Sequence, residues 1–178
     1  MPTTKRGYDM YELLSALQKD IRRGNTEQAL FWAIELGDFN DVLLWNRLIV
    51  IASEDIGAAN PFVSILIEIL RQQYFKFKQS KKSERRLFLT NAILVLSRSP
   101  KNRMVDDLTY VVNAEIQFEG KKLNIPDYAL DMHTLRGKKM GRGRKHFNQV
   151  GCKLVNEKLS NPYRDRATKL FKKYGKLK

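Results

Sequence analysis

The sequence is poor in the residues that build disulfide bonds, metal sites and nucleotide sites. Its 178 residues include one cysteine and two histidines. Cys152 therefore has no partner for an internal disulfide bond. His133, His146 and Cys152 match no common zinc spacing and lack a fourth ligand. The GxxxxGK[ST] phosphate loop is also missing, which argues against ATP hydrolysis of the P-loop type. We predict no metal, no cofactor and no catalytic residue, and hence no enzymatic activity.

Long apolar runs are also absent. The N-terminal segment MPTTKRGYDMYELL has no apolar stretch after its basic pair and is not a signal peptide. The longest apolar stretches, near 43–52 and 62–70, are too short for a bilayer, which needs about 20 apolar residues. We therefore expect an intracellular protein that is not secreted and has no membrane partner. Its expected location is the cytoplasm (nucleoid) or the nucleus.

Acidic residues are scarce in one part of the chain. The whole sequence carries 33 Lys and Arg against 19 Asp and Glu, a net charge of +14. Residues 1–120 hold 16 basic and 15 acidic residues (+1), whereas residues 121–178 hold 17 and 4 (+13). We therefore predict a nearly neutral body over 1–120 and a basic C-terminal extension over 121–178, packed on or beside it. A positive field of this size favours an anionic partner such as nucleic acid.

The spacing of apolar residues is helical through most of the chain. They recur every three or four positions, which predicts six helices over about 8–23, 25–36, 40–52, 60–77, 83–98 and 102–119. Gly24 and Gly37 are expected to end the first two helices, Asp38 or Asn40 to begin the third, and Asn60 with Pro61 to begin the fourth. In the sixth helix, Val105, Leu108 and Ile116 are expected to face inward. The fold class is therefore all-α, a helical bundle with Trp32 and Trp45 in its core.

The C-terminal extension has a different composition. Residues 136–145 contain three glycines and six basic residues, typical of an irregular basic loop, and short helices are expected over 147–159 and 162–174. We predict that this extension contacts the DNA backbone without regard to base sequence. The predicted contact residues are Arg136, Lys138, Lys139, Arg142, Arg144, Lys145, His146, Lys172 and Lys173.

Two more specific forms of nucleic-acid binding are suggested by this segment. The repeat Arg142-Gly143-Arg144 is the core of an AT-hook, whose arginines enter the minor groove, but Lys145 stands where proline usually follows. We therefore favour phosphate contacts. Aromatic residues among lysines and arginines can also stack on unpaired bases. Because their spacing is helical, we favour core packing for the four aromatic residues concerned, which are Tyr128, Phe147, Tyr163 and Tyr174.

One string carries most of the information about identity. Arg47-Leu-Ile-Val-Ile-Ala-Ser-Glu-Asp-Ile-Gly57, followed by Asn60-Pro61, resembles the C-terminal region of the replication-associated recombination protein A family. These are AAA+ ATPases related to the clamp loader, and they include the Werner helicase-interacting protein. Tyr11–Gly24, Ala29–Ala33 and Ser99–Asn102 are similar to further segments of the family, so the resemblance covers about residues 8–115. The residues that match its central motif are Ser53, Glu54, Asp55, Ile56, Gly57, Asn60 and Pro61.

The resemblance implies a helical collar of the clamp-loader type, self-association as in the family's tetramers, and a role in DNA replication, recombination or repair. It does not extend to the ATPase core, so we expect a free-standing C-terminal module. Glu54 and Asp55 are adjacent, and neighbouring side chains on a helix point about 100° apart. We therefore favour a structural role for them, bonding backbone groups of the Ile56-Gly57 turn, over a catalytic pair.

Three functions remain open from the sequence. The favoured one is a non-enzymatic, oligomerising module that binds DNA through its basic extension. The second is a protein-interaction subunit that assembles with a separately encoded AAA+ ATPase. The third is a small DNA-processing nuclease that uses Asp131, His133 or Glu54.

Overall fold

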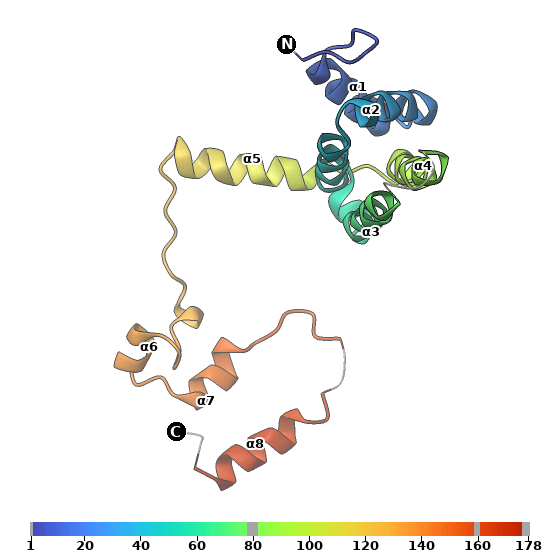
Figure 1. The fold of residues 1–178 in the computed structure, drawn as a ribbon. Coiled ribbons are helices and arrows are strands. Elements are labelled where there is room, and N and C mark those ends of the chain that lie inside the picture. The colour runs from blue at the N-terminus through green and yellow to red at the C-terminus, as the bar shows by residue number, and fades with distance from the viewer. Residues whose placement is uncertain (1, 78–81, 159–160, 176–178) are drawn as a thin grey trace. The chain divides into compact units, whose positions relative to one another are not determined.

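The computed structural model describes residues 2–77, 82–158 and 161–175 (Figure 1). The described residues form helices and no β-strand, apart from one isolated bridge between Thr3 and Asp9. The prediction of an all-α fold is therefore confirmed. The chain divides into two compact units, Met1–Gly120 and Lys121–Lys178. No helix in the described part of the chain has the length and apolar character needed to cross a membrane.

Helix α1 (Met10–Arg23) has well-defined ends. The Asp9 carboxylate accepts hydrogen bonds from the amides of Tyr11 and Glu12 at 2.8 and 3.1 Å, which satisfies two donors of the first turn. Gly24 follows the last turn with φ 78°, a left-handed conformation that costs glycine little. The predicted end of the first helix at Gly24 is confirmed.

Helix α2 (Thr26–Ile51) corrects the expected break at Gly37. The helix continues past Gly37, and its backbone leaves helical geometry at Asn40 (φ −154°, ψ 96°). The Asn40 side chain accepts a hydrogen bond from the Leu43 amide at 2.9 Å and so restarts the helix. A Cβ on Gly37 would lie 3.0 Å from Leu44, so this glycine permits close packing and does not end the helix.

The central motif follows α2 without a break. A π-helical turn (η1, Ala52–Ile56) and a 3-10 turn (η2, Gly57–Ala59) lead to α3 (Val63–Lys76). Asn60 and Pro61 were predicted to begin this helix, but they lie before α3, which begins at Val63. The Asn60 carbonyl accepts from the Val63 amide at 3.0 Å, and its side-chain amide donates to the Ser99 hydroxyl at 3.4 Å. Asn60 therefore links the α3 entry to the end of α4 (Lys82–Arg98).

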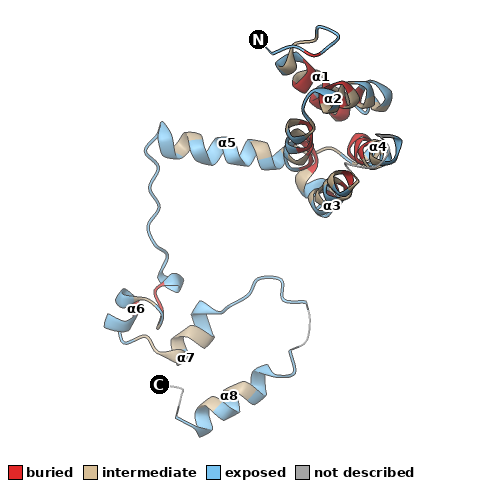
Figure 2. Ribbon diagram, viewed as in Figure 1, coloured by how far each residue is buried: buried red, intermediate tan, exposed pale blue. Residues whose placement is uncertain are grey.

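Helices α1 to α4 enclose the core of the first unit. Figure 2 shows their buried sides facing one another, and α2 contacts α1, α3 and α4. Trp45 is fully buried in this core, as predicted. Trp32 is half-buried at its edge, where the indole N–H donates to Asp20 at 2.8 Å. Tyr74 is also buried there, and the other large side chains of the core are Leu13, Leu17, Ile21, Leu36, Leu44, Leu48, Ile51, Ile56, Ile67, Leu89 and Ile93.

Helix α5 (Met104–Gln117) differs most from the prediction. It contains no buried residue, and its main contacts within its unit are with η1 and η2. Leu108 is 61% exposed and Ile116 is 56% exposed, so the expectation that they face the core is wrong. The apolar spacing predicted a helix here, and α5 confirms it. No helix of the described first unit covers the apolar side of α5, however.

The second unit contains short helices. They are η3 (Asp127–Ala129), α6 (Leu135–Lys139), α7 (Arg144–His146), η4 (Phe147–Gly151) and α8 (Arg164–Lys173). The expectation of an irregular loop over 136–145 is therefore wrong for 136–139, which lie in α6, and for 144–145, which lie in α7. The helix expected over 147–159 ends at Gly151, and residue 159 lies outside the described residues.

Candidate functional site

The family motif forms a buried ionic network in the first unit. Asp55 is fully buried, and its carboxylate accepts hydrogen bonds from Gln18 Nε2 at 3.1 Å and Arg22 Nε at 2.8 Å, both on α1. Arg103 Nη1 donates to the same carboxylate at 2.9 Å. Removing a carboxylate from water is costly unless cations and hydrogen bonds compensate it, and here two guanidinium groups do so.

Glu54 joins the same network. Its Oε1 atom accepts from Arg22 Nη2 at 3.3 Å and from Arg103 Nη1 at 3.0 Å. The two neighbouring carboxylates thus converge on two shared guanidinium groups, although their side chains were expected to diverge. They were also expected to bond backbone groups of the Ile56-Gly57 turn, and they bond these two arginines instead. Hydrogen bonding to Glu54 and Asp55 raises the pKa of Arg103. The arrangement neutralises both carboxylates and leaves neither as a free general base.

The segment Ser99–Asn102 attaches this network to the end of α4. Lys101 Nζ donates to the carbonyls of Leu96, Ser97 and Ser99 at 2.7–2.9 Å, which satisfies the last carbonyl groups of the helix. Burial of the ammonium group lowers the pKa of Lys101. The Asn102 amide donates to the Asp55 carbonyl at 2.9 Å. The motif and this segment therefore fix the point from which α5 leaves the bundle.

Gly57 is required where α5 meets the motif. Its φ is +42°, and a Cβ placed there would lie 2.7 Å from Cγ2 of Val105. A larger residue would therefore be strained in its backbone and would push the start of α5 away.

The second unit is organised around Asp131. Its carboxylate accepts from the His133 amide at 2.8 Å and lies 3.2 Å from His133 Nδ1. These bonds, the backbone one first, lower the pKa of Asp131. Gly137 packs so closely on the Asp131 backbone that a Cβ would lie 1.9 Å from the Asp131 carbonyl oxygen. Thr134 caps α6 by accepting from the Gly137 amide at 3.0 Å.

Arg142 completes this framework and is not a free cation. Its guanidinium donates to the carbonyls of Asp127 and Leu130, both at 2.8 Å, and to the Asp127 carboxylate at 2.6 Å. Hydrogen bonding to Arg142 lowers the pKa of Asp127. The side chain is only 16% exposed. Its AT-hook partner Arg144 is also half-buried, with its guanidinium 4.6 Å from the Phe171 ring. We therefore expect neither arginine to enter a minor groove.

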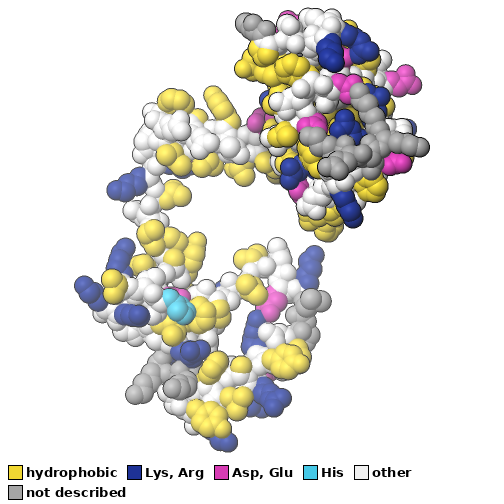
Figure 3. Space-filling view, viewed as in Figure 1, with side chains coloured by type: hydrophobic (Ala, Val, Ile, Leu, Met, Phe, Trp, Pro, Cys, Tyr) yellow, Lys and Arg dark blue, Asp and Glu magenta, His cyan; other side chains and the backbone are white. Residues whose placement is uncertain are grey.

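The other predicted DNA contacts are mostly well exposed. Figure 3 shows Lys and Arg side chains spread over the surface of the second unit. Within the described residues, no ion pair neutralises the exposed lysines and arginine of this set. His146 is half-buried, and its Nδ1 has no hydrogen-bond partner in the described part of the chain. The exposed members of the predicted set are Arg136, Lys138, Lys139, Lys145, Lys172 and Lys173.

The aromatic residues of this unit correct a second expectation. Tyr128, Tyr163 and Tyr174 are 63%, 70% and 64% exposed, so core packing is wrong for these three. Phe147, the fourth residue of that set, is half-buried, with its ring edge-to-face against His133 at 4.9 Å. Exposed tyrosines beside cations are available for stacking on unpaired bases. Core packing had been expected from their helical spacing.

The arrangement offers little support for a catalytic or metal centre. Asp131 and His133 bond each other within the fold of the second unit, and Glu54 is bound by Arg22 and Arg103. Among the residues described, no group of three or more His, Cys, Asp and Glu side chains is placed to hold a metal ion.

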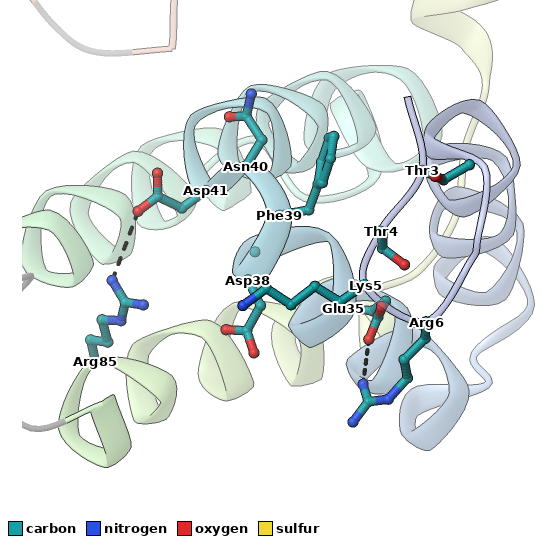
Figure 4. A pocket seen from close by; sticks show the side chains of 11 residues that line it. Thr3, Thr4, Lys5, Arg6, Glu35, Asp38, Phe39, Asn40, Asp41 and Arg85 are labelled. Atoms are coloured by element: carbon teal, nitrogen blue, oxygen red, sulfur yellow. Dashed lines mark hydrogen bonds and ion pairs between the residues drawn. The ribbon is translucent and has the colours of Figure 1, made fainter. Parts of the chain in front are cut away.

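A cavity of about 1000 Å³ lies between the N-terminal segment and the kink of α2 (Figure 4). Its charged side chains pair across it: Arg6 bonds Glu35, and Arg85 lies 3.8 Å from Asp41. The charges are therefore balanced, and this cavity has no preference for an anion.

Comparison with known proteins decides the family. Residues 24–169 match the family described as MgsA AAA+ ATPase C terminal. The chain belongs to this family. It is 34% identical over 144 residues to replication-associated recombination protein A of Bacillus subtilis, covering 78% of this chain and 32% of that protein. The identity is 30% over 133 residues in Haemophilus influenzae (72% and 27%) and 26% over 145 residues in Escherichia coli K12 (79% and 31%).

The match to the MgsA C-terminal family confirms the resemblance and corrects its extent. It runs from residue 24 to residue 169, well beyond the 115 expected, and therefore includes Glu54, Asp55, Arg103 and most of the basic unit. The chain spans about a third of the length of the curated relatives that it matches. Gln18, Arg22 and Arg103, which hold Asp55, were missed as motif partners. The sequence pointed to such partners only through Asp55 itself, because a carboxylate within an apolar run needs a cation near it when it is buried.

Proposed function

We propose that this chain is a non-enzymatic, oligomerising module that binds DNA through its basic second unit. The observation that carries this proposal is the set of six exposed cations, from Arg136 to Lys173, in a unit of charge +13. Three of the four carboxylates of the unit are already bonded, Asp127 to Arg142, Asp131 to His133 and Glu157 to Arg164. The proposed setting is recombination associated with replication, which the names of the relatives support.

The contacts proposed are with phosphates. Lysine ammonium groups bind phosphate oxygens without reading bases, so affinity depends on how many condensed cations the protein releases from the DNA. The short helices keep Arg136, Lys138 and Lys139 on one segment, and the Asp131 framework holds that segment in place. Sequence-independent binding follows from this chemistry.

The test is a titration of the chain with duplex DNA at several salt concentrations. If all six exposed cations contact phosphates, the logarithm of the binding constant should fall linearly with the logarithm of salt, with a slope of about −5. Duplexes of different base composition should bind with similar affinity. Absence of binding at low salt, or affinity that does not change with salt, would contradict the proposal.

Self-association is supported by a separate observation, the exposed apolar surface of α5. Eight apolar side chains between Met104 and Phe118 are 41–82% exposed. Surfaces of this kind usually mark contacts with another protein chain. We propose a second copy of this chain as the partner, in line with the tetramers that the resemblance implies. A separate AAA+ ATPase is the second candidate, and light scattering that shows a monomer would favour it.

A further inference from the structure

Helix α8 carries an aromatic stripe that nothing covers in the described part of its unit. Tyr163 precedes the helix and Tyr174 follows it, eleven residues apart. Eleven residues are about three turns, so the two rings lie within about 20° of the same side and roughly 16 Å apart along the axis. Ala167 and Leu170 lie between them on that side. Both tyrosines are more than 60% exposed, and Leu170 is 45% exposed.

Cations flank this stripe on one side. By helical geometry Arg166 and Lys173 lie about 60–80° from it, whereas Lys172 points to the opposite face. Lys173 Nζ is 5.4 Å from the Tyr174 ring. On the other flank, Arg164 is bonded to Glu157 at 2.6 Å, and Arg144 covers Phe171. The stripe therefore combines two exposed rings with one row of positive charge.

We propose that this stripe binds single-stranded DNA, with the rings of Tyr163 and Tyr174 stacked on unpaired bases and Arg166 and Lys173 on the phosphates. The proposal rests on the proposed DNA binding and defines its substrate class. A separation of roughly 16 Å can be spanned by a few nucleotides of an unpaired strand. Duplex DNA keeps its base faces stacked inside, so only an unpaired strand can use both rings.

The composition of the stripe favours bases over a lipid surface. A helix that lies in a membrane interface buries a broad face of large apolar side chains. Here the middle of the stripe is Ala167 and Leu170, and the large groups are rings at its two ends. Each ring has room for a base, and the charge beside it matches the backbone of a strand.

The experiment compares single-stranded and duplex DNA on the full chain. A fluorescently labelled thymidine homopolymer and a labelled duplex are titrated at low salt with the unmodified protein and with Tyr163→Leu/Tyr174→Leu. The double variant should bind the single strand roughly 10- to 100-fold more weakly and the duplex within about twofold of the original. Tyr163→Phe/Tyr174→Phe keeps both ring faces and should bind like the unmodified protein.

Matched controls use side chains that the geometry separates. Tyr11→Leu removes a tyrosine that is 63% exposed on α1, outside both proposed contacts, and it should leave single-strand affinity unchanged. Lys173→Ala should weaken single-strand binding more than Lys172→Ala does. Circular dichroism of each variant checks that the helices are retained.

Each alternative outcome has a defined meaning. Duplex binding with single-strand binding that is unaffected by the leucine variant overturns this inference and leaves the proposed function standing. Equal loss on both DNA forms also overturns it, because stacking on unpaired bases would then not be the cause. Failure of the unmodified chain to bind any DNA overturns both. Vesicles containing phosphatidylserine form the last arm: if the leucine variant loses only vesicle binding, the stripe is a lipid site.

Discussion

Asp55 is the residue whose surroundings explain most about the family motif. It is fully buried, and it holds Arg22 of α1 and Arg103 at the start of α5 at 2.8 and 2.9 Å. Three segments distant in sequence therefore meet at one carboxylate. Glu54 lies beside it and binds the same two guanidinium groups. The pair holds the bundle and α5 together.

We expect Asp55→Asn to lower the free energy of unfolding by about 3 kcal/mol. Asparagine has a similar shape, but it removes one of the two negative charges that Arg22 and Arg103 share. Removing one partner of a buried ionic network typically costs several kcal/mol. Urea denaturation followed by circular dichroism measures the effect. The matched control is Asp107→Asn, an exposed carboxylate in the first turn of α5, which should cost less than about 1 kcal/mol. Equal stability of the two variants would contradict a central role for Asp55.

Arg142 shows why single residues of the basic unit could not be assigned from the sequence. The pattern of glycines and cations predicted six equivalent phosphate ligands between 136 and 145. The fold instead directs Arg142 to two carbonyls and the Asp127 carboxylate. An arginine in a glycine-rich segment can bond a phosphate or the chain's own carbonyls, and only the backbone path decides between them.

Helix α5 is the element with the largest consequence for assembly. It leaves the bundle after the Asp55 network and presents its apolar side chains without cover from its own unit. Figure 2 shows it exposed or half-buried along its length. We therefore assign to α5 the contact between copies of the chain.

We expect Leu108→Asp to dissociate the oligomer, because Leu108 is 61% exposed and a charge would be buried in the contact. The mass measured by light scattering should fall to that of one chain at concentrations where the unmodified protein is oligomeric. Asn113→Asp adds the same charge about 140° around the helix and should leave the mass unchanged. An unmodified protein that is already monomeric would refute the assignment.

Much of the element pattern could be predicted from the sequence, because local chemistry decides it. Gly24 ends α1 as expected, and Asn40, one of the two residues considered for the next helix start, restarts α2 with its side chain. The exposure of α5 could not be predicted, since periodicity shows which side of a helix is apolar and not what covers it. Contacts such as Arg22 to Asp55 join residues 33 positions apart, beyond the reach of local patterns.

At the scale of the whole molecule, charge and packing are divided between two units. The first unit, close to neutral, contains the buried core, the Asp55 network and α5. The second has charge +13 and few buried residues, namely Leu130, Asp131 and Gly137 among those described. The family match covers residues 24–169, so it spans parts of both units and includes most of the basic unit.

The central claim is that DNA binding resides in the exposed cations of the second unit. The most direct measurement is the duplex affinity, at one low salt concentration, of two triple variants that remove the same charge. Lys138→Ala/Lys139→Ala/Lys145→Ala removes three cations of the basic unit, and Lys19→Ala/Lys76→Ala/Arg98→Ala removes three exposed cations of the first unit. We predict that the first variant binds at least about tenfold more weakly and that the second stays within about threefold of the original. Equal losses in the two variants would contradict the account.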